Sequence, residues 1–350
     1  MRANTATILA HLPRGARLFA VVKAGAYGHG AVPVARAALE GGAYGLAVAT
    51  LEEVRELRTI ERSERVLLMG GLIPELAREA AESGCSIAVS TLELARVLSE
   101  SDEVVPVHLK IDTGMGRFGA APEEAAQLAR FINSSPGLRL AGTWTHFASA
   151  GSDEAMTRRQ FDRFSEALAT FDVDPGLRHA CNSAAALRYP EMALDGVRAG
   201  IALYGCEWPG AQPALTLRSV INHLKTLSKG DTVGYGATWQ SPGTTHVATV
   251  AIGYADGVFR QRSNRGHVLV RGRRAPLIGA VSMDAITIDV TDVPGIGVGD
   301  VVTLIGEDGA ERISAEEVAK WSDTISHDVL ASIGPRVERR YVPEEGGAPE

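Results

Sequence analysis

The chain has 350 residues, of which 45% are hydrophobic and 22% charged, a profile typical of a globular protein with one to three domains. Its net charge of −7 and its isoelectric point near 5.8 argue against nucleic acid or an anionic membrane as partner. No apolar run is long enough for a membrane span or a signal peptide, and Cys85, Cys181 and Cys206 match neither a disulfide framework nor a CxxC metal site, so we expect a reduced, cytoplasmic protein without a metal.

The first predicted strand is FAVVKA (19–24), which is followed by a glycine-rich turn, AYGHG, and a helical pattern, AVPVARAALE. This order is typical of a buried parallel strand and its crossover helix. Lys23 therefore lies at the carboxyl end of the strand, where α/β folds place their chemistry. It is either a solvated or ion-paired charge, or an amine whose lowered pKa lets it form a Schiff base.

Strand-like runs alternate with helical patterns up to residue 205. The runs are FAVVKA (19–24), YGLAVA (44–49), VLLMGG (66–71), CSIAVS (85–90), VPVHLKID (105–112), LAGTWTHF (140–147), LRHACNS (177–183) and GVRAGIALYG (196–205). Thr50 with Glu53 predicts a helix that opens with a capping box, Thr91 predicts a simple cap, and Pro74 and Pro122 suit first helical positions. Eight strands with seven crossover helices fit a (β/α)8 barrel better than an open sheet, and the GxGxxG spacing typical of dinucleotide-binding sheets is absent.

The pattern changes after Pro209-Gly210 to closely spaced strands with turn signals between them. These runs are LTLRSVINHLKTL, VGYGATW, THVATVAIGY, HVLVRG, RRAPLIGAVSM, AITIDV and DVVTLIGE, followed by one short helix, SAEEVAKWS. We predict an α/β protein: an N-terminal (β/α)8 TIM-like barrel over residues 1–210, a C-terminal mostly antiparallel β domain over 211–343, and a disordered tail over 344–350.

Polar and small residues collect at or just past the predicted barrel strand ends, which converge on one face. They are Lys23, Tyr27, Arg117, His146, Asn182, Ser183, Arg198, Gly200 and Ile201. A lysine, a set of hydroxyls and small backbone residues, and two arginines suit an anionic, phosphorylated cofactor that carries an aldehyde. Pyridoxal phosphate fits this description, with the lysine on the aldehyde and Ser and Gly/Ile amides on the phosphate.

At this point the sequence resembles the alanine racemase family. The matching motifs, in order along nearly the whole chain, are VVKAGAYGHG (21–30), LKIDTGMGRFG (109–119), THF (145–147), NSAAAL (182–187), VRAGIALYG (197–205), GYGATW (234–239), IGYADG (252–257) and SMD (282–284). The family's fold, a barrel followed by a β domain, agrees with the fold predicted above.

The resemblance implies a role for each matching position. Lys23 would bind the cofactor and act as one base, and Tyr235 of the partner subunit in a homodimer would act as the other base on the opposite face. The phosphate would be held by Tyr27, Ser183, Gly200 and Ile201, with Asn182 nearby. Arg198 would face the pyridine nitrogen with His146 behind it, and Arg117 would approach the cofactor oxygen and the substrate carboxylate.

Four further positions carry implied roles. Lys110 resembles a lysine that is carbamylated in many members of the family, where it orients the arginine. Met283 and Asp284 would line the substrate pocket, and Tyr254 resembles a residue of the corridor through which substrate enters.

Several of these residues also have purely structural interpretations. His146 can be a hydrogen-bonded core histidine, Ser183 a helix cap, and Met283 core filler. Tyr235 can be a surface aromatic in a turn, and Lys110 can simply pair with Asp112 or Asp102.

The chain also departs from the family pattern. Gly25 stands where the family usually has a polar residue, Glu338 replaces the proline of an RVPR motif, and Pro335 replaces a tyrosine that could add a phosphate contact. The family's first strand has no counterpart before Met1, which leaves open an upstream start or a second domain with one strand fewer.

Three functions remain in competition at this stage. The first is interconversion of L- and D-alanine, which would supply D-alanine for peptidoglycan, with serine or broader specificity left open. The second is decarboxylation of basic amino acids, which Arg198 disfavours because a cation opposes protonation of the pyridine nitrogen. The third is a non-catalytic pyridoxal-phosphate-binding protein, whose small relatives lack the β domain and hence Tyr235.

Overall fold

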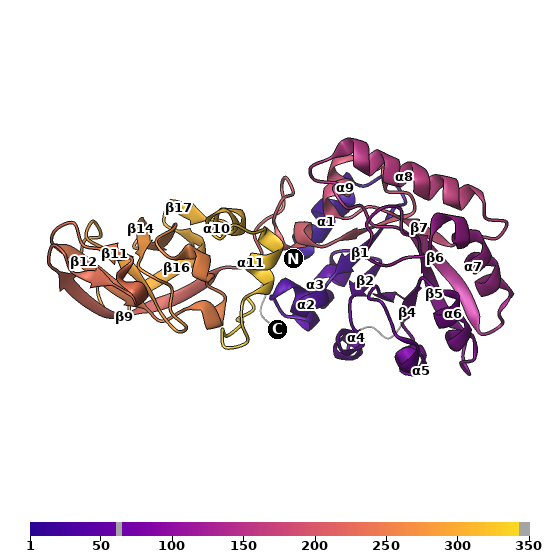
Figure 1. The fold of residues 1–350 in the computed structure, drawn as a ribbon, viewed down its shortest axis with the longest axis horizontal. Coiled ribbons are helices and arrows are strands. Elements are labelled where there is room, and N and C mark those ends of the chain that lie inside the picture. The colour runs from indigo at the N-terminus through magenta and orange to yellow at the C-terminus, as the bar shows by residue number, and fades with distance from the viewer. Residues whose placement is uncertain (61–64, 343–350) are drawn as a thin grey trace. The chain divides into compact units, whose positions relative to one another are not determined.

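The computed structural model describes residues 1–60 and 65–342 and divides into two compact units (Figure 1). The first unit comprises Met1–Ala26 and Gly30–Gln212, and the second comprises Tyr27–His29 and the chain from Pro213 onward. The predicted disordered tail, 344–350, lies outside the described residues. None of the described helices combines the length and the apolar content that a bilayer crossing requires.

The first unit is a closed barrel of eight parallel strands, which confirms the predicted barrel. The strands are β1 (Arg17–Val21), β2 (Gly45–Val48), β3 (Val66–Leu68), β4 (Ser86–Val89), β5 (Val105–Lys110), β6 (Leu138–Trp144), β7 (Leu177–His179) and β8 (Gly196–Ala199). Strands β2, β3, β4 and β8 are buried along their whole length, because helices cover the outside of the barrel and side chains fill its interior.

Helices surround these strands, as Figure 1 shows. They are α1 (Arg2–His11), α3 (Ala31–Glu40), α4 (Leu51–Leu57), α5 (Ala77–Glu82), α6 (Leu92–Ser99), α7 (Pro122–Ser134), α8 (Glu154–Ala169) and α9 (Ser183–Arg188), with 3-10 turns η1 (Pro74–Leu76), η2 (Pro190–Met192) and η3 (Ile201–Tyr204). The short segment labelled α2 (Lys23–Tyr27) is a left-handed turn and not a regular helix. The predicted capping box of Thr50 and Glu53 and the cap at Thr91 are both present. Helix α1 was not predicted, because its sequence has no clear apolar stripe.

All eight barrel strands end before the predicted runs do, and in β6 and β8 the earlier end changes the place of candidate site residues. Strand β6 stops at Trp144, so His146 follows the strand instead of lying on it. Strand β8 stops at Ala199, and the run IALY forms the 3-10 turn η3 because the backbone of Gly200 (φ −113°, ψ −92°) turns the chain out of the sheet. Gly200 and Ile201 therefore lie past the strand, at its carboxyl end.

The second unit is antiparallel, as predicted. Its strands are β9 (Leu217–Leu227), β10 (Thr232–Val233), β11 (Trp239–Gln240), β12 (Thr245–Val250), β13 (His267–Val270), β14 (Arg273–Ile278), β15 (Ile286–Asp289), β16 (Val301–Asp308) and β17 (Glu311–Ile313). The order β13-β14-β15-β12-β9-β16-β17, with an added β13–β16 pairing, joins six of the strands into a ring. The short helix α10 (Ala315–Trp321) was predicted, whereas β17 and α11 (Ser326–Ala331) were not.

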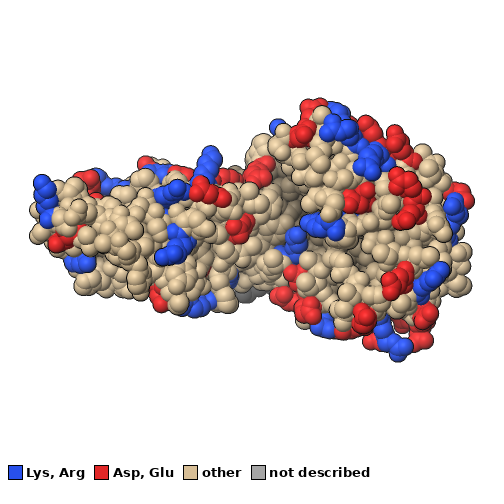
Figure 2. Space-filling model, in the orientation of Figure 1, with Lys and Arg blue, Asp and Glu red and all other residues tan. Residues whose placement is uncertain are grey.

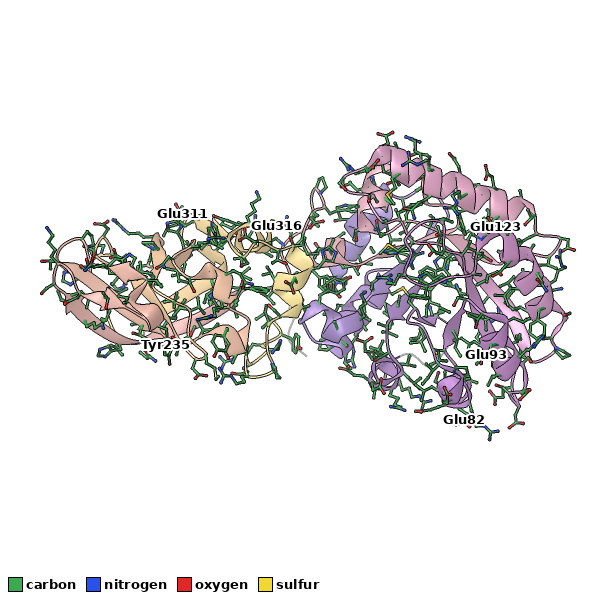
Figure 3. All side chains as sticks on the ribbon, in the orientation of Figure 1. Glu82, Glu93, Glu123, Tyr235, Glu311 and Glu316 are labelled. Atoms are coloured by element: carbon green, nitrogen blue, oxygen red, sulfur yellow. The ribbon has the colours of Figure 1, made fainter. Side chains whose placement is uncertain are left out.

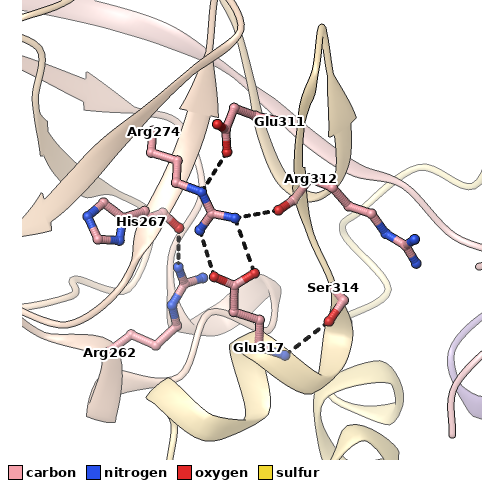
Figure 4. Close-up of polar contacts among 7 residues, drawn as sticks. All are labelled: Arg262, His267, Arg274, Glu311, Arg312, Ser314 and Glu317. Carbon is pink, nitrogen blue, oxygen red and sulfur yellow. Dashed lines mark hydrogen bonds and ion pairs between the residues drawn. The ribbon is translucent and has the colours of Figure 1, made fainter.

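Arg274 ties helix α10 to the sheet of the second unit (Figure 4). Its guanidinium donates to Glu311 on β17 at 2.7 Å and to Glu317 on α10 at 2.6 Å. On the face drawn in Figure 2, acidic and basic side chains are interspersed over both units.

Candidate active site

Lys23 lies two residues past the last residue of β1, at the carboxyl end of a barrel strand. The backbone N–H of the preceding Val22 still donates to Ala47 of β2 at 2.9 Å, so the sheet fixes the point from which Lys23 projects. Burial and the nearby Arg117 lower the pKa of the half-buried Lys23 amine, and Glu53 opposes this by raising it. More of this amine is therefore unprotonated at neutral pH than in an exposed lysine.

The residues after Lys23 form a left-handed turn. Ala24, Gly25, Ala26 and Tyr27 have φ values of 53°, 57°, 53° and 53°. The turn is held by a bond from Ala26 N–H to the Val22 carbonyl at 2.9 Å and by one from Ala24 N–H to the Glu53 carboxylate at 2.6 Å. Left-handed backbone costs roughly 1–2 kcal/mol per non-glycine residue and persists where the surroundings over-determine it, often at functional sites.

Arg198 on β8 is a buried cation surrounded by neutral acceptors. Its Nη1 donates to His179 Nδ1 at 2.7 Å and to the His179 carbonyl at 2.9 Å, and its Nη2 donates to the Thr145 carbonyl at 2.7 Å and to His146 Nδ1 at 3.3 Å. Burial lowers the pKa of Arg198 to about 9, so the guanidinium stays protonated at neutral pH. Its Nε has no partner among the described residues.

Two buried histidines, His179 and His108, extend the hydrogen bonds of Arg198. His179 Nε2 lies 2.8 Å from Nδ1 of His108. Because Arg198 can only donate, His179 Nδ1 must accept, so its Nε2 carries the proton and donates to His108. Burial holds the pKa of His179 well below its usual value and lowers that of His108 to about 3, and both rings are therefore neutral.

The Trp144 ring contacts the cationic groups of both Arg198 and Lys110. Strand register aligns Lys110 with Trp144 and Trp144 with His179 across β5, β6 and β7. The Trp144 ring is stacked on His179, with an interplanar angle of 3°. The Arg198 guanidinium carbon lies 4.6 Å from the Trp144 ring centroid, and the Lys110 amine lies 5.0 Å from it.

Lys110 is only 1% exposed, and its amine has no hydrogen-bond partner among the described residues. The amine lies 3.1 Å from the centroid of the Phe118 ring. Burial, then Arg117 and Arg198, lower the pKa of Lys110 to about 7, while Asp112 raises it. Asp112 is not its salt-bridge partner, because its carboxylate accepts the backbone N–H groups of the loop that carries Arg117.

Ser183, Gly200 and Ile201 lie together beyond β7 and β8. The Ser183 hydroxyl accepts the Gly200 N–H at 3.0 Å. Asn182, not Ser183, caps helix α9 with its side-chain oxygen, which accepts the Ala185 N–H at 3.0 Å. Ser183 is therefore free of the capping role that its sequence position suggested.

The second unit carries its own hollow, with a volume of about 760 Å³. It is lined by Tyr235, Tyr254, Arg260, Val281, Met283 and Asp284. Tyr235, labelled in Figure 3, lies in a 3-10 turn, η4 (Tyr235–Ala237), and is 72% exposed. Met283 is 51% exposed, so it is not the core filler that its residue type allowed.

The barrel unit thus brings Lys23, Lys110, Arg117 and Arg198 within electrostatic reach of His146, and it brings Ser183 to the Gly200–Ile201 turn. The second unit brings together Tyr235, Tyr254, Met283 and Asp284. Tyr27 groups with the second unit, where its ring centroid lies 5.8 Å from that of His327.

Several residues of these two clusters were not predicted from the sequence: His108, Trp144, His179 and Arg260. His108 and His179 are titratable residues within predicted barrel strands, and that signal could have singled them out.

Known proteins match the chain along almost its whole length. The family model described as "Alanine racemase, N-terminal domain" matches residues 1–207, and the model described as "Alanine racemase, C-terminal domain" matches residues 214–341. An alanine racemase of Sorangium cellulosum is 43% identical over 93% of this chain and 91% of its own length.

Two solved structures are also similar. An alanine racemase from Bacillus anthracis with bound L-Ala-P gives a TM-score of 0.87 at 37% identity, covering 96% of this chain and 91% of that one. A histidine racemase from Leuconostoc mesenteroides gives a TM-score of 0.87 at 30% identity, covering 98% and 95%.

Proposed function

The chain belongs to the alanine racemase family, and from that premise we propose that it interconverts L-alanine and D-alanine with pyridoxal phosphate as cofactor. The observation that carries this proposal is the pair of unlike bases: the half-buried Lys23 amine on the barrel unit and the exposed Tyr235 phenol on the second unit. The product D-alanine would serve peptidoglycan synthesis.

The barrel residues fit pyridoxal phosphate. Arg198 Nε is a buried donor that finds no acceptor in the described part of the chain, and a pyridine nitrogen is an acceptor of the size and type that would satisfy it. Because the groups that accept hydrogen bonds from Arg198 are all neutral, its positive charge is not cancelled locally, and it would keep that ring nitrogen unprotonated. His146 and the His179–His108 pair would hold the guanidinium in place.

The phosphate would be held at the turn after β8. The Ser183 hydroxyl, which accepts the Gly200 N–H and keeps its own hydrogen to donate, and the N–H of Ile201 would supply donors there, and the Gly200 N–H could join them by exchanging Ser183 for the phosphate. Asn182 fixes the start of α9 beside them. Tyr27 would add a phenolic donor, and burial raises its pKa to about 12, so it stays protonated.

When bound, the cofactor supplies an electron-withdrawing ring that makes the α-proton of an attached amino acid acidic. Lys23 holds the cofactor at its amine and exchanges a proton at Nζ on one face of the substrate. Tyr235 of the partner subunit exchanges a proton at its phenolic oxygen on the other face. Removal on one side and return on the other inverts the α-carbon, which neither base could do alone.

Arg117 would receive the substrate carboxylate, oriented by a carbamylated Lys110. The neutral amine of Lys110 would attack CO2 at carbon and release one proton to solvent, leaving an anionic carbamate. This changes the sign of the charge that faces Arg117, from a repelling ammonium to an attracting carbamate. Met283, Asp284 and Tyr254 of the hollow would line the substrate site and its corridor.

We assign the domain roles accordingly. Residues 1–210 bind the cofactor, and residues 211–343 complete the active site of the partner subunit in a cytoplasmic homodimer. Each site would then need both chains, so that a monomer would lack one of the two bases.

An assay with both enantiomers of alanine tests the proposal: either one should be converted to a racemic mixture, and the purified protein should show a visible cofactor absorbance. A panel of amino acids that includes serine, histidine and lysine would set the specificity, because the similar fold of a histidine racemase shows that this scaffold admits other side chains. Release of CO2 from lysine without racemisation of any amino acid would instead indicate a decarboxylase.

A further inference from the structure

The C-terminal segment of the second unit presents Arg336 to two carboxylates. Arg339 anchors the segment through bonds to the carbonyls of Ile333 and Val337, both at 2.6 Å. The Arg336 guanidinium then reaches Asp256 at 2.9 Å and Asp284 at 2.8 Å. Arg339 thus fixes the backbone of the segment, and Arg336 forms ion pairs with the two aspartates.

The two aspartates belong to the two loops that line the hollow. Asp256 ends the turn η5 (Tyr254–Asp256), and its second oxygen accepts the Gly253 N–H at 2.9 Å. Asp284 follows Met283 in the other loop. These loops are already joined by two backbone bonds, from Tyr254 N–H to the Ser282 carbonyl and from Ala255 N–H to the Met283 carbonyl, each at 3.0 Å.

The distinct contribution of Arg336 is therefore its charge. Asp284 is the one acidic residue among those that line the hollow, and Arg260 is the one basic residue. The Asp284 side chain is 66% exposed and would repel the carboxylate of an approaching amino acid. If Arg336 did not pair with it, Asp284 would also attract a substrate with a cationic side chain.

We propose that Arg336 is a positioning residue that sets substrate preference by cancelling the charge of Asp284, so that the hollow accepts a small amino acid through its carboxylate. This inference rests on the proposed function, because it takes the hollow to be the substrate side of a racemase.

The test compares four variants of the full-length protein: Arg336→Met, Arg336→Lys, the double variant Arg336→Met/Asp284→Asn, and the control Arg274→Met. The control fits because Arg274 also pairs with two carboxylates in the same unit, at Glu311 and Glu317 (Figure 4), and these three residues are not among those that line the hollow. In low-salt buffer, Arg336→Met should raise KM for alanine and the inhibition constant of propionate by about three- to tenfold, the range expected for one nearby charge in water when little salt is present to screen it.

The other variants distinguish charge from structure. Arg336→Lys keeps the charge and should keep most of the wild-type KM, although it loses the two-sided fork of arginine. Adding Asp284→Asn to Arg336→Met should bring the KM for alanine back toward the wild-type value. The ratio of the KM for lysine to the KM for alanine should fall in Arg336→Met, where Asp284 is charged and has lost Arg336, and not in the double variant. Arg274→Met should lower the melting temperature with KM unchanged.

A KM for Arg336→Met equal to that of the wild type would overturn the inference. A double variant with a KM at least as high as that of Arg336→Met would overturn it too, because removing Asp284 cannot restore a structural contact that was lost with Arg336. Wild-type protein that fails to racemise alanine would refute the proposed function instead, and the two failures are thereby distinguishable.

Discussion

Lys110 should take up CO2 as a carbamate in a pH-dependent way. A pKa of about 7 instead of 10.5 raises the neutral fraction of its amine at pH 7 from roughly one in three thousand to about one half, and only the neutral amine attacks CO2. The burial that lowers the pKa also keeps water from the product. The carbamate should therefore form as the pH rises through 7 and be lost as it falls below 6.

The measurement is 13C NMR of the protein equilibrated with 13C-labelled bicarbonate between pH 5.5 and pH 8.5. One carbamate carbonyl signal should grow over this range in the wild-type protein and in Lys225→Ala, a control at an exposed lysine on β9. The signal should be missing from Lys110→Arg, whose guanidinium does not react. A signal that persists in Lys110→Arg, or a wild-type spectrum without one at pH 8.5, would refute the assignment.

The remaining predictions concern both half-sites. Lys23→Ala should remove the visible cofactor absorbance and nearly all racemisation, and retention of wild-type turnover would end its assignment as a base. Co-expressed Lys23→Ala and Tyr235→Phe chains, each poorly active alone, should regain about a quarter of wild-type activity, since random pairing gives about half heterodimers, each with one intact site of two. If purified heterodimers show no recovery of activity, a site shared between subunits is excluded. Arg198→Glu should slow racemisation, increase side transamination and change the visible spectrum with substrate, because an anion lets the ring nitrogen stay protonated; an unchanged spectrum would separate Arg198 from that nitrogen. Gly142→Ala should cost about 1–3 kcal/mol in a denaturant titration, because its Cβ would lie 2.6 Å from His108 Nδ1, and unaltered stability would show that the histidine pair can shift freely.

The sequence alone determined the architecture of both units. Apolar runs that end in polar residues, separated by capped helices, are local patterns, and a parallel barrel follows from repeating them eight times. The same reasoning located Lys23 and Arg198 at strand ends, because the carboxyl end of a strand can be read from where its apolar run stops. Tyr235 and Met283 came from motif resemblance, and the structure places both on one hollow.

Only the tertiary structure decided what surrounds these residues. Arg198 receives its shortest side-chain contact from His179, not from the expected His146, because strand pairing sets which neighbour faces the guanidinium and no sequence period reports that pairing. The left-handed turn after Lys23 contains two alanines, a residue type that gives no signal for positive φ, since the surrounding hydrogen bonds impose it. The pairing of Arg336 with Asp284, 52 positions apart, likewise exists only because the fold brings the two segments together.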